Sequence, residues 1–560
     1  MSGRTRTIAA ALLAGLWLAS LTGSSAAADS SPSDTERSFP FSLSLRSPYA
    51  GARAASDPAA FSLAAPPGRD TSEANEGAPG PKKRPGRAWI ELGAFLTYST
   101  VSYWTRAAFP EDWQFRLNWH DQFDRVFLLK GWRFDSNNFR LNWSHVLAGS
   151  VYYQFARTNN LSWIDSWLMA VAASTYWETV VEWKEVISVN DQITTGLGAF
   201  STGEPWYQIG HYLAHQRGLL AQVLSFIDPA VKLNHWLDRK QPGAKDYAQP
   251  GWHDFAVFLG GRRLTRAGQP AETGLYFGLH TRLLMLPEYG RPGDFRRTLK
   301  DTYFSGISLD YTTRNGQADE TNFTTGAVTL GYYRQKIDGG SGGYSLTVGL
   351  GSSFEYFKKR PFDTYDSAPV PVKQGYDLHL ERPRNFTDKL ALLHLAGPVL
   401  DLTVFRPGLR LRTVVEAYFD FGLVNSYALN AYSGLHHTPP DDTIEGLKTT
   451  VMYYGYYYAF GGTLSGQTNL EWGSFRAQVL AGFGAWSSVD GLDRFQNEIT
   501  NNAHLDDNRS RHLLGAGWKV PRTSFELFVK YEVIRRWGRL LEVRVRSLER
   551  RLFAGLEFSF

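Results

Sequence analysis

The 560-residue sequence predicts a mainly β protein: a transmembrane antiparallel β-barrel of about 12 strands, with an N-terminal helical domain. Three observations predict this fold class. Apolar and polar side chains alternate from Trp252 to Phe560, 14% of the chain is aromatic alongside 53 Gly, and the first 28 residues resemble an export signal. No apolar run of about 20 residues follows that signal, which excludes a helical-bundle membrane protein.

Charge and cysteine content exclude further classes. The chain has no Cys, so disulfide scaffolds, thiolate metal sites and cysteine nucleophiles are excluded. A net charge of +5 is too weak for this length to indicate a nucleic-acid partner, so none is predicted.

The N-terminal part is predicted to direct export. Arg4 and Arg6 precede an apolar stretch from Ile8 to Leu21, and small residues follow, so residues 1–28 are predicted to be a cleaved signal peptide. Residues 29–86 are rich in Pro, Ala, Ser and Gly without a sustained apolar period, which predicts a disordered linker. The expected location is therefore the bacterial outer membrane.

Residues 246–560 are predicted to form the barrel. Apolar residues such as Phe525, Leu527 and Val529 alternate with charged ones such as Glu526 and Lys530, which suits lipid outside and a wet or plugged lumen inside. A soluble β-sandwich would also alternate, but its strands are commonly shorter. Thirteen segments fit: residues 252–262, 272–286, 299–314, 321–336, 342–358, 388–404, 407–422, 451–471, 475–487, 509–518, 523–535, 539–547 and 551–560.

Twelve strands are predicted, within a range of ten to fourteen, because bacterial single-chain barrels have even strand numbers. One of the thirteen segments is then wrong, or one strand is missing. Pro407-Gly408 and Gly473-Ser474 are expected to be short periplasmic turns, and residues 359–386, 423–449 and 488–507 outer loops.

Aromatic residues near the segment ends fit a membrane-interface girdle, so outer-membrane lipid is an expected partner. The chain ends on Phe560 in an amphipathic segment. This ending resembles bacterial outer-membrane barrels, and the resemblance implies recognition of Phe560 by the barrel-insertion machinery.

Residues 87–245 are predicted to form the helical domain. Ser144 to Arg157, Ser162 to Glu185 and Glu204 to Arg239 have helical patterns, and Trp163, Trp167 and Trp177 lie at helical spacing in the second. The apolar part of that helix is too short to span a bilayer. The helices are therefore expected to plug the barrel lumen or to sit at its periplasmic mouth.

The runs FRLNWSHVLAGSVYYQFARTNNLSW and TYWETVVEWKEVISVNDQITTGLGAFSTGE, between Phe139 and Glu204, resemble domain-of-unknown-function family 3943. Family members often have Pro where this chain has Val146 and Ile187, so the local turns are expected to differ. The resemblance implies a domain and an envelope setting, and no reaction.

The same region carries the candidate chemistry. Glu178, Glu182 and Glu185 lie on one helical face, near His145 and Asp191 in the motif. One hypothesis makes His145, Glu178 and Glu182 catalytic and makes Glu182, Glu185 and Asp191 ligands of a divalent metal. No other cofactor is expected.

The alternative is structural, with the carboxylates pairing with nearby bases or capping helices. The candidate bases are Arg157, Lys184 and Arg217, and the candidate caps are Asp191 and Glu204.

Two further patterns are weaker. His211 and His215 have a spacing that can hold zinc, but HYLAH lacks the Glu of a zinc-protease helix, so a packed pair is favoured. The glycine-rich segment 339–343 lacks the Lys and helix of a phosphate loop and is predicted to be a turn.

Three functions are compatible with the sequence. The favoured one is an outer-membrane barrel in envelope transport or integrity, with a helical plug or gate. The second is an outer-membrane enzyme that acts on lipid or lipopolysaccharide through a His/carboxylate centre. The third is a scaffold that recruits periplasmic partners through residues 29–86.

Overall fold

The structure is a computed structural model, and the residues it describes belong to one compact unit, Glu76–Phe560. The described residues are 82–106, 113–134, 139–216, 218–239, 250–266, 269–340, 342–360, 388–429, 431–432, 448, 451, 455–494, 496 and 503–559. The predicted signal peptide (1–28), most of the predicted linker (29–86), Arg217 and the terminal Phe560 lie outside them.

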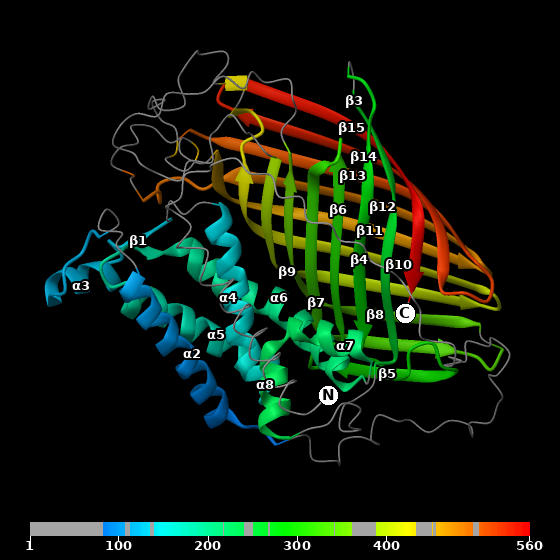
Figure 1. The fold of residues 1–560 in the computed structure, drawn as a ribbon, viewed down its shortest axis with the longest axis horizontal. Helices are drawn as coiled ribbons and strands as arrows, with labels where there is room; N and C mark the ends of the chain where they lie inside the picture. Colours follow the sequence, from blue (N-terminus) through cyan, green and yellow to red (C-terminus); the bar gives the residue numbers. More distant parts are fainter. Residues whose placement is uncertain are drawn as a thin grey trace. The chain divides into compact units, whose positions relative to one another are not determined.

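Twelve antiparallel strands close into a ring (Figure 1). Apart from β5, each strand pairs with the next one in the chain, so that β4 pairs with β6, and β15 pairs with β3 to close the ring. β5 pairs only with β7. The strands are β3 (Trp252–Arg266), β4 (Glu272–Leu284), β5 (Gly293–Leu299), β6 (Phe304–Arg314), β7 (Gln317–Ile337), β8 (Gly343–Lys359), β9 (Asp388–Arg406), β10 (Leu409–Asn425), β11 (Tyr456–Trp472), β12 (Phe475–Ser488), β13 (Leu505–Lys519), β14 (Phe525–Leu540) and β15 (Val543–Ser559).

The predicted count of twelve is confirmed. β5 and β6 pair with successive parts of β7, residues 331–337 and 317–328, so they occupy one place in the ring. The incorrect segments are 539–547 and 551–560, which form the single strand β15. The polar run from Ser547 to Arg550 looks like a turn in sequence, yet it stays paired with β14, and the hairpin lies at Leu541–Glu542 instead.

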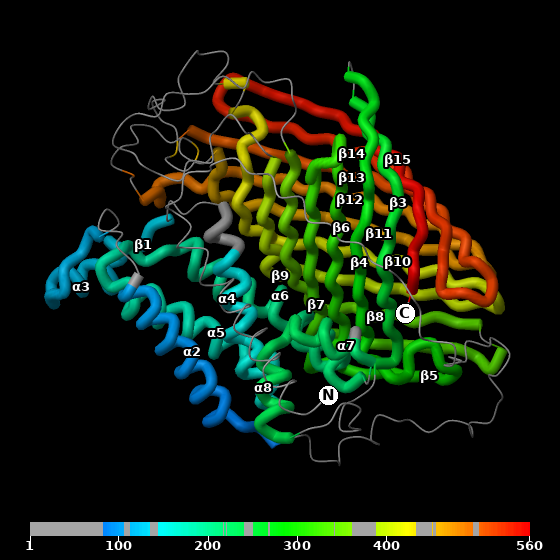
Figure 2. The backbone as a smooth tube through the Cα atoms, viewed as in Figure 1, coloured from blue at the N-terminus to red at the C-terminus, as the bar shows by residue number. Residues whose placement is uncertain are grey.

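The two ends of the barrel differ. The predicted turns Pro407-Gly408 and Gly473-Ser474 join strands at one end, here called the short-turn end, and both glycines have positive φ. The connections after β8, β10 and β12 lie at the opposite end, here called the long-loop end. Figure 2 traces β10–β13 across the wall opposite the green strands.

The two faces of the wall differ as the alternation predicts. On β14, Phe525, Leu527 and Val529 are 45%, 46% and 50% exposed, whereas Glu526 and Glu532 are buried. Exposed apolar residues therefore face outward, and charged residues face the lumen.

Nine helical segments precede the barrel among the described residues. They are α2 (Pro85–Arg106), α3 (Trp119–Val126), α4 (Phe139–Arg157), α5 (Trp163–Tyr176), the π-helical turn η2 (Trp177–Val181), α6 (Val189–His215), α7 (Leu219–Leu224) with the short 3₁₀ turn η3 (Ser225–Ile227), and α8 (Pro229–Leu237). Two-residue strands β1 (Trp132–Arg133) and β2 (Ile187–Ser188) pair in parallel. No described helix has the length and apolarity needed to cross a membrane.

The predicted helix boundaries need correction at α6, which begins at Val189 and not at Glu204. The residues before Glu204, which include several glycines, continue the helix, and some of these glycines serve helix packing. A Cβ at Gly149 of α4 would lie 2.0 Å from the Thr195 carbonyl oxygen, and one at Gly203 would lie 3.0 Å from Tyr153. Glycine is therefore what lets α4 and α6 approach this closely.

The helices pack against the outer face of the barrel. Thr325 of β7 donates to the Ser201 carbonyl of α6 at 2.9 Å, and Val146 of α4 joins an apolar cluster with Phe421 of β10. Phe421 shares its strand face with Phe419, which is 54% exposed, whereas the intervening Asp420 points inward. The expectation that the helices plug the lumen is therefore not met by the described helices.

Candidate functional site

Glu178, one of the predicted catalytic residues, is buried in η2. Its Oε2 accepts a hydrogen bond from the Ser188 backbone N–H at 2.9 Å. The fully buried guanidinium of Arg125 donates to the backbone carbonyls of Glu178, Glu182 and Glu185. Arg125 therefore satisfies the carbonyls that the π turn and the end of the helix leave without helical partners.

The other predicted residues surround the same junction. Glu182 Oε1 accepts from Trp177 Nε1 at 2.7 Å, and the Glu185 carboxylate accepts from the Tyr103 hydroxyl. His145 Nδ1 lies 3.5 Å from Asp191 Oδ1, so Asp191 is the carboxylate that the structure places beside the histidine.

The predicted metal ligands do not come together as a metal site. No three described Asp, Glu or His side chains, including those of Glu182, Glu185 and Asp191, form a group that could hold a metal ion. Asp191 is held at the start of α6, where its backbone N–H donates to the Ser188 hydroxyl at 3.2 Å. This geometry fits the structural alternative, since Ser188 caps α6 and Asp191 lies in its first turn.

A buried ion pair joins α4 and α6. Arg157 binds Glu204 through two hydrogen bonds of 2.8 and 2.9 Å. Tyr153 and Gln208 donate to the same carboxylate at 2.6 and 2.8 Å. Arg157 also contacts Asp301, in the connection between β5 and β6, at 3.0 Å. Glu204, which the sequence suggested as a helix cap, is therefore an interior ion-pair partner.

Two further sequence patterns were the pair His211 and His215 and the glycine-rich segment 339–343. The rings of His211 and His215 stack with centroids 4.7 Å apart, and His235 of α8 packs across both. Asp338 and Gly342 close a tight turn between β7 and β8, with the Asp338 N–H donating to the Gly342 carbonyl at 2.9 Å. Both observations agree with the favoured predictions, which were a packed histidine pair and a turn.

Asp228 is a buried carboxyl group that the sequence did not suggest. Its Oδ1 caps α8 by accepting from the Val231 N–H at 3.0 Å, while Oδ2 is buried without a hydrogen-bond partner. Burial raises the pKa of Asp228 well above its usual value, and the backbone hydrogen bonds at the helix start offset this only in part.

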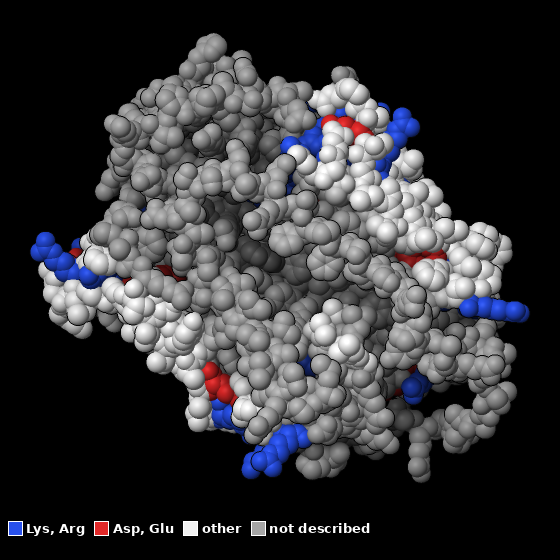
Figure 3. Space-filling view, in the orientation of Figure 1, with Lys and Arg blue, Asp and Glu red and all other residues white. Residues whose placement is uncertain are grey.

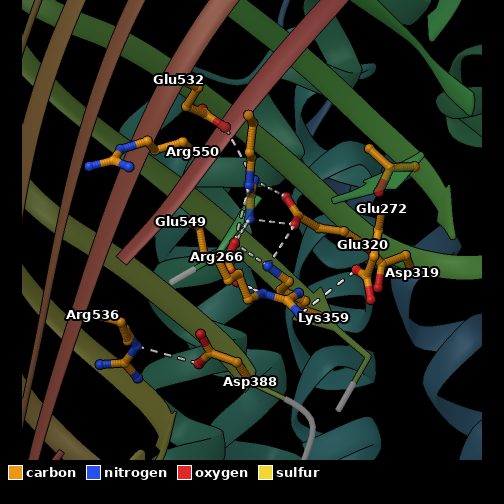
Figure 4. Close-up of polar contacts among 12 residues, drawn as sticks. Arg266, Glu272, Asp319, Glu320, Lys359, Asp388, Glu532, Arg536, Glu549 and Arg550 are labelled. Carbon is orange, nitrogen blue, oxygen red and sulfur yellow. Dashed lines mark hydrogen bonds and ion pairs between the residues drawn. The ribbon is translucent and has the colours of Figure 1, made fainter. Parts of the chain in front are cut away.

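The barrel lumen contains a larger charged cluster, shown in Figure 4 and here called the lumen network. Arg551 of β15 is its centre, at 2.7, 3.1 and 2.8 Å from Glu320, Glu532 and Glu549. Those carboxylates have further cationic partners. Lys359 contacts Glu549, Arg266 lies 3.1 Å from Glu549, and Arg511 lies 2.5 Å from Glu532.

At the long-loop end, described residues of the connection between β10 and β11 lie in the lumen. Leu429, Tyr432 and Val451 pack in one apolar cluster with the inward-facing residues Trp486 and Tyr457. The sequence predicted residues 423–449 as an outer loop, and nothing local in that stretch indicated insertion.

At the short-turn end, the connection between β4 and β6 also enters the lumen. The Tyr289 hydroxyl lies 2.9 Å from Thr403 Oγ1, and Gln335 donates to the carbonyls of Glu288 and Arg291 at 2.8 Å. Thr403 and Gln335 are fully buried residues of the inner wall.

Two small cavities lie in the described part of the lumen. One, of about 40 Å³, is lined by the lumen network, and the other, of about 80 Å³, by residues that include Arg476, Gln478 and Glu557. An aromatic cluster of Phe258, Tyr276, Phe528 and Phe553 contributes to the walls of both. Cavities of this size hold only a few water molecules.

The comparisons with known proteins separate the chain into two parts. Residues 131–230 match the family model "Domain of unknown function (DUF3943)". No functionally curated protein matches the chain.

The barrel is similar to solved outer-membrane barrels. The β domain of the Bordetella autotransporter Brka has 14% identity and a TM-score of 0.20, with 55% of this chain and 99% of that chain covered. OmpT of Vibrio cholerae has 4% identity, a TM-score of 0.21 and coverages of 55% and 97%. The NalP translocator domain of Neisseria meningitidis has 11% identity, a TM-score of 0.17 and coverages of 59% and 96%.

Proposed function

We propose that this protein is a gated outer-membrane channel, exported by its N-terminal signal, that opens for small polar solutes. The apolar outer face of the closed ring suits lipid, and the charged inner face suits water and polar solutes. The observation that carries the proposal is the insertion of Leu429, Tyr432 and Val451 against the inward-facing Trp486. A connection between strands, and not the wall itself, closes the lumen there.

Opening requires changes at both ends of the lumen and between them. At the short-turn end, the β4–β6 connection around Tyr289 has to move aside. The β10–β11 connection has to withdraw, which exposes apolar side chains around Trp486 to water. The lumen network then has to rearrange, and this is less costly than breaking a single pair because each carboxylate around Arg551 keeps another cation nearby. A polar or charged solute can replace such pairs with pairs of its own, whereas an apolar solute cannot.

Single-channel recording in planar bilayers tests the gate. Leu429→Asp with Tyr432→Asp places charges in the apolar contact and should convert a mostly closed protein into one with long open states. Leu541→Asp, at the exposed β14–β15 turn of the same end, is the matched control and should stay closed. Equal conductance of the unmodified protein and the double variant would contradict a gate at this connection.

A second candidate function is an enzyme that acts on lipid or lipopolysaccharide. It is favoured by the pairing of His145, whose side chain is 24% exposed, with Asp191, since a carboxylate can orient a histidine general base. His145→Ala and Asp191→Asn should then both alter the lipid profile of the envelope. Unchanged profiles in cells with folded variants would remove this candidate.

A further inference from the structure

The helical bundle, with the segment that leads into α4, contacts the barrel at both ends of its wall. At the long-loop end, Phe134 stacks on Tyr458 with ring centroids 4.8 Å apart, and its N–H bonds to the Leu492 carbonyl. At the short-turn end, Trp163 donates to the Lys300 carbonyl at 3.2 Å, and Tyr212 of α6 packs on Phe255. A barrel inserted in a bilayer therefore has these helices at the depth of its own apolar band, which is about 25 Å tall.

The side of α2 that faces away from the bundle suits hydrocarbon. Ala88, Leu92 and Leu96 are its buried stripe, whereas Ile90 and Val101 are 73% and 57% exposed. Between residues 88 and 105 the one charged residue is Glu91, which binds Arg87 and Asn159. This stretch spans about 27 Å at 1.5 Å per residue.

Basic residues mark the ends of that stretch. Residues 82–87 contain four Lys or Arg, and Arg106 ends the helix. In Figure 3 blue side chains, with a few red ones beside them, gather near the N-terminal end of α2, and the described surface farther along the helix is mostly white. Basic residues at the boundaries of an uncharged stretch are typical of segments at a membrane interface.

The neighbouring helix α5 has the same character. Ile164 and Leu168 are 44% and 52% exposed, and Val180 of η2 is 55% exposed. No charged residue occurs from 166 to 177. The flanking Asp165 takes part in the helix N-cap and binds Lys83 at 3.0 Å, so its charge is paired.

The interior of the bundle has two features that are typical of helices packed in lipid. Close contacts rest on small residues, as at Gly149 with Thr195 and Gly198 with Val146. Arg157 and Glu204 are buried as a bonded pair, so that charge does not reach the outer faces.

We propose that the exposed faces of α2 and α5–η2 contact lipid acyl chains, so that the membrane-facing surface of this protein is part helical and part barrel. The uncharged stretches of α2 and α5, with basic residues at the ends of the α2 stretch, favour lipid over a protein partner or water as the occupant. The proposal depends on insertion of the barrel in a bilayer, which is part of the proposed function, and not on gating.

The lack of native Cys permits single-site labelling. Ile90→Cys and Leu168→Cys, each labelled with a fluorophore in the full-length protein, would be reconstituted in phosphatidylcholine vesicles that contain acyl-chain-brominated lipid. Leu527→Cys on the outer face of β14 is the barrel control, and Lys130→Cys, whose native side chain is 60% exposed, is the water control.

Labels at 90 and 168 should be quenched by brominated lipid as strongly as the label at 527, and several-fold more than the label at 130. Iodide in the buffer should give the opposite order. Quenching at 90 and 168 by iodide alone, or by neither quencher, overturns the proposal because water or protein then covers these faces.

The barrel control separates this proposal from the proposed function. A label at 527 that is quenched while those at 90 and 168 are not leaves the inserted barrel intact and rejects lipid contact by the helices. A label at 527 that brominated lipid does not quench shows that the barrel itself is not inserted.

Discussion

The helical bundle and the barrel lumen both bury arginines, but they surround them differently. In the bundle, Arg157 makes two parallel hydrogen bonds to one carboxylate, Glu204. In the lumen, Arg551 is shared by three carboxylates, each within 3.1 Å.

The two regions differ in which partners a buried carboxylate keeps when one of its cations moves away. Glu204 without Arg157 would be a fully buried charge with two neutral donors, whereas Glu549 without Arg551 would keep Lys359 and Arg266. The bundle therefore has a single favourable arrangement of its charges, and the lumen network has several of similar energy. This suits a rigid support beside a lumen that rearranges.

The largest expected effect breaks the bundle. Arg157→Met should lower the free energy of unfolding by about 3–5 kcal/mol, since it leaves Glu204 buried without a counter-charge. Urea unfolding of the protein in detergent, followed by Trp fluorescence, measures this loss. Glu204→Gln in the same chain should restore part of it, and Lys83→Met, at an exposed ion pair, should change stability little. An equal loss for Arg157→Met and Lys83→Met would contradict this account.

A smaller effect is expected in the lumen. Arg551→Met should lower the free energy of unfolding by about 1–3 kcal/mol, because Lys359, Arg266 and Arg511 still neutralise the carboxylates it leaves. The same urea titration compares the two arginine variants directly. A loss as large as that of Arg157→Met would remove the distinction between the two regions.

The smallest expected effect is a gain in stability at Asp228. Because burial raises the pKa of this carboxyl group in the folded state, its contribution to stability is present below the pKa of the unfolded chain and is lost as pH rises toward the folded pKa. Asn keeps the cap on Val231 and does not ionise, so Asp228→Asn should stabilise the protein at pH 7 by on the order of 1 kcal/mol.

Thermal unfolding between pH 4 and pH 8 checks the sign at Asp228. The difference between the variant and the unmodified protein should shrink as pH falls toward 4, where Asp in the unfolded chain is also becoming protonated. A difference that is constant across this range would show that ionisation of Asp228 is not its cause.

The barrel could be predicted because its signal is local. Strand period follows from neighbouring residues, so the ring of twelve was predictable, and the error at β15 arose where polar residues continue a strand. The start of α6 was predicted too late for a similar reason. Its first turns pack against α4 through glycines, and the sequence period does not report contacts between helices.

The Glu178 junction and the lumen network are formed by residues that are far apart in the sequence, so they could be predicted only in part. Glu178, His145 and Asp191 do gather at one junction, but Arg125, which organises its carbonyls, comes from a helix 53 residues earlier. Arg551 and Glu320 lie 231 residues apart. The inward fold of the β10–β11 connection and the outer position of the helices likewise follow from contacts between remote segments, for which a single sequence gives no pattern.

The position of the helices also gives the barrel a front and a back within the plane of a membrane. α6 contacts β4 and β6–β9, while apolar residues of β3 and β10–β15 remain exposed. A second copy or another membrane protein that packs directly against the barrel wall is blocked where the helices lie and can approach from the side of these exposed strands. Neighbours of this protein would therefore be arranged around it on one side, and pairs formed directly between barrels would point their helices away from each other.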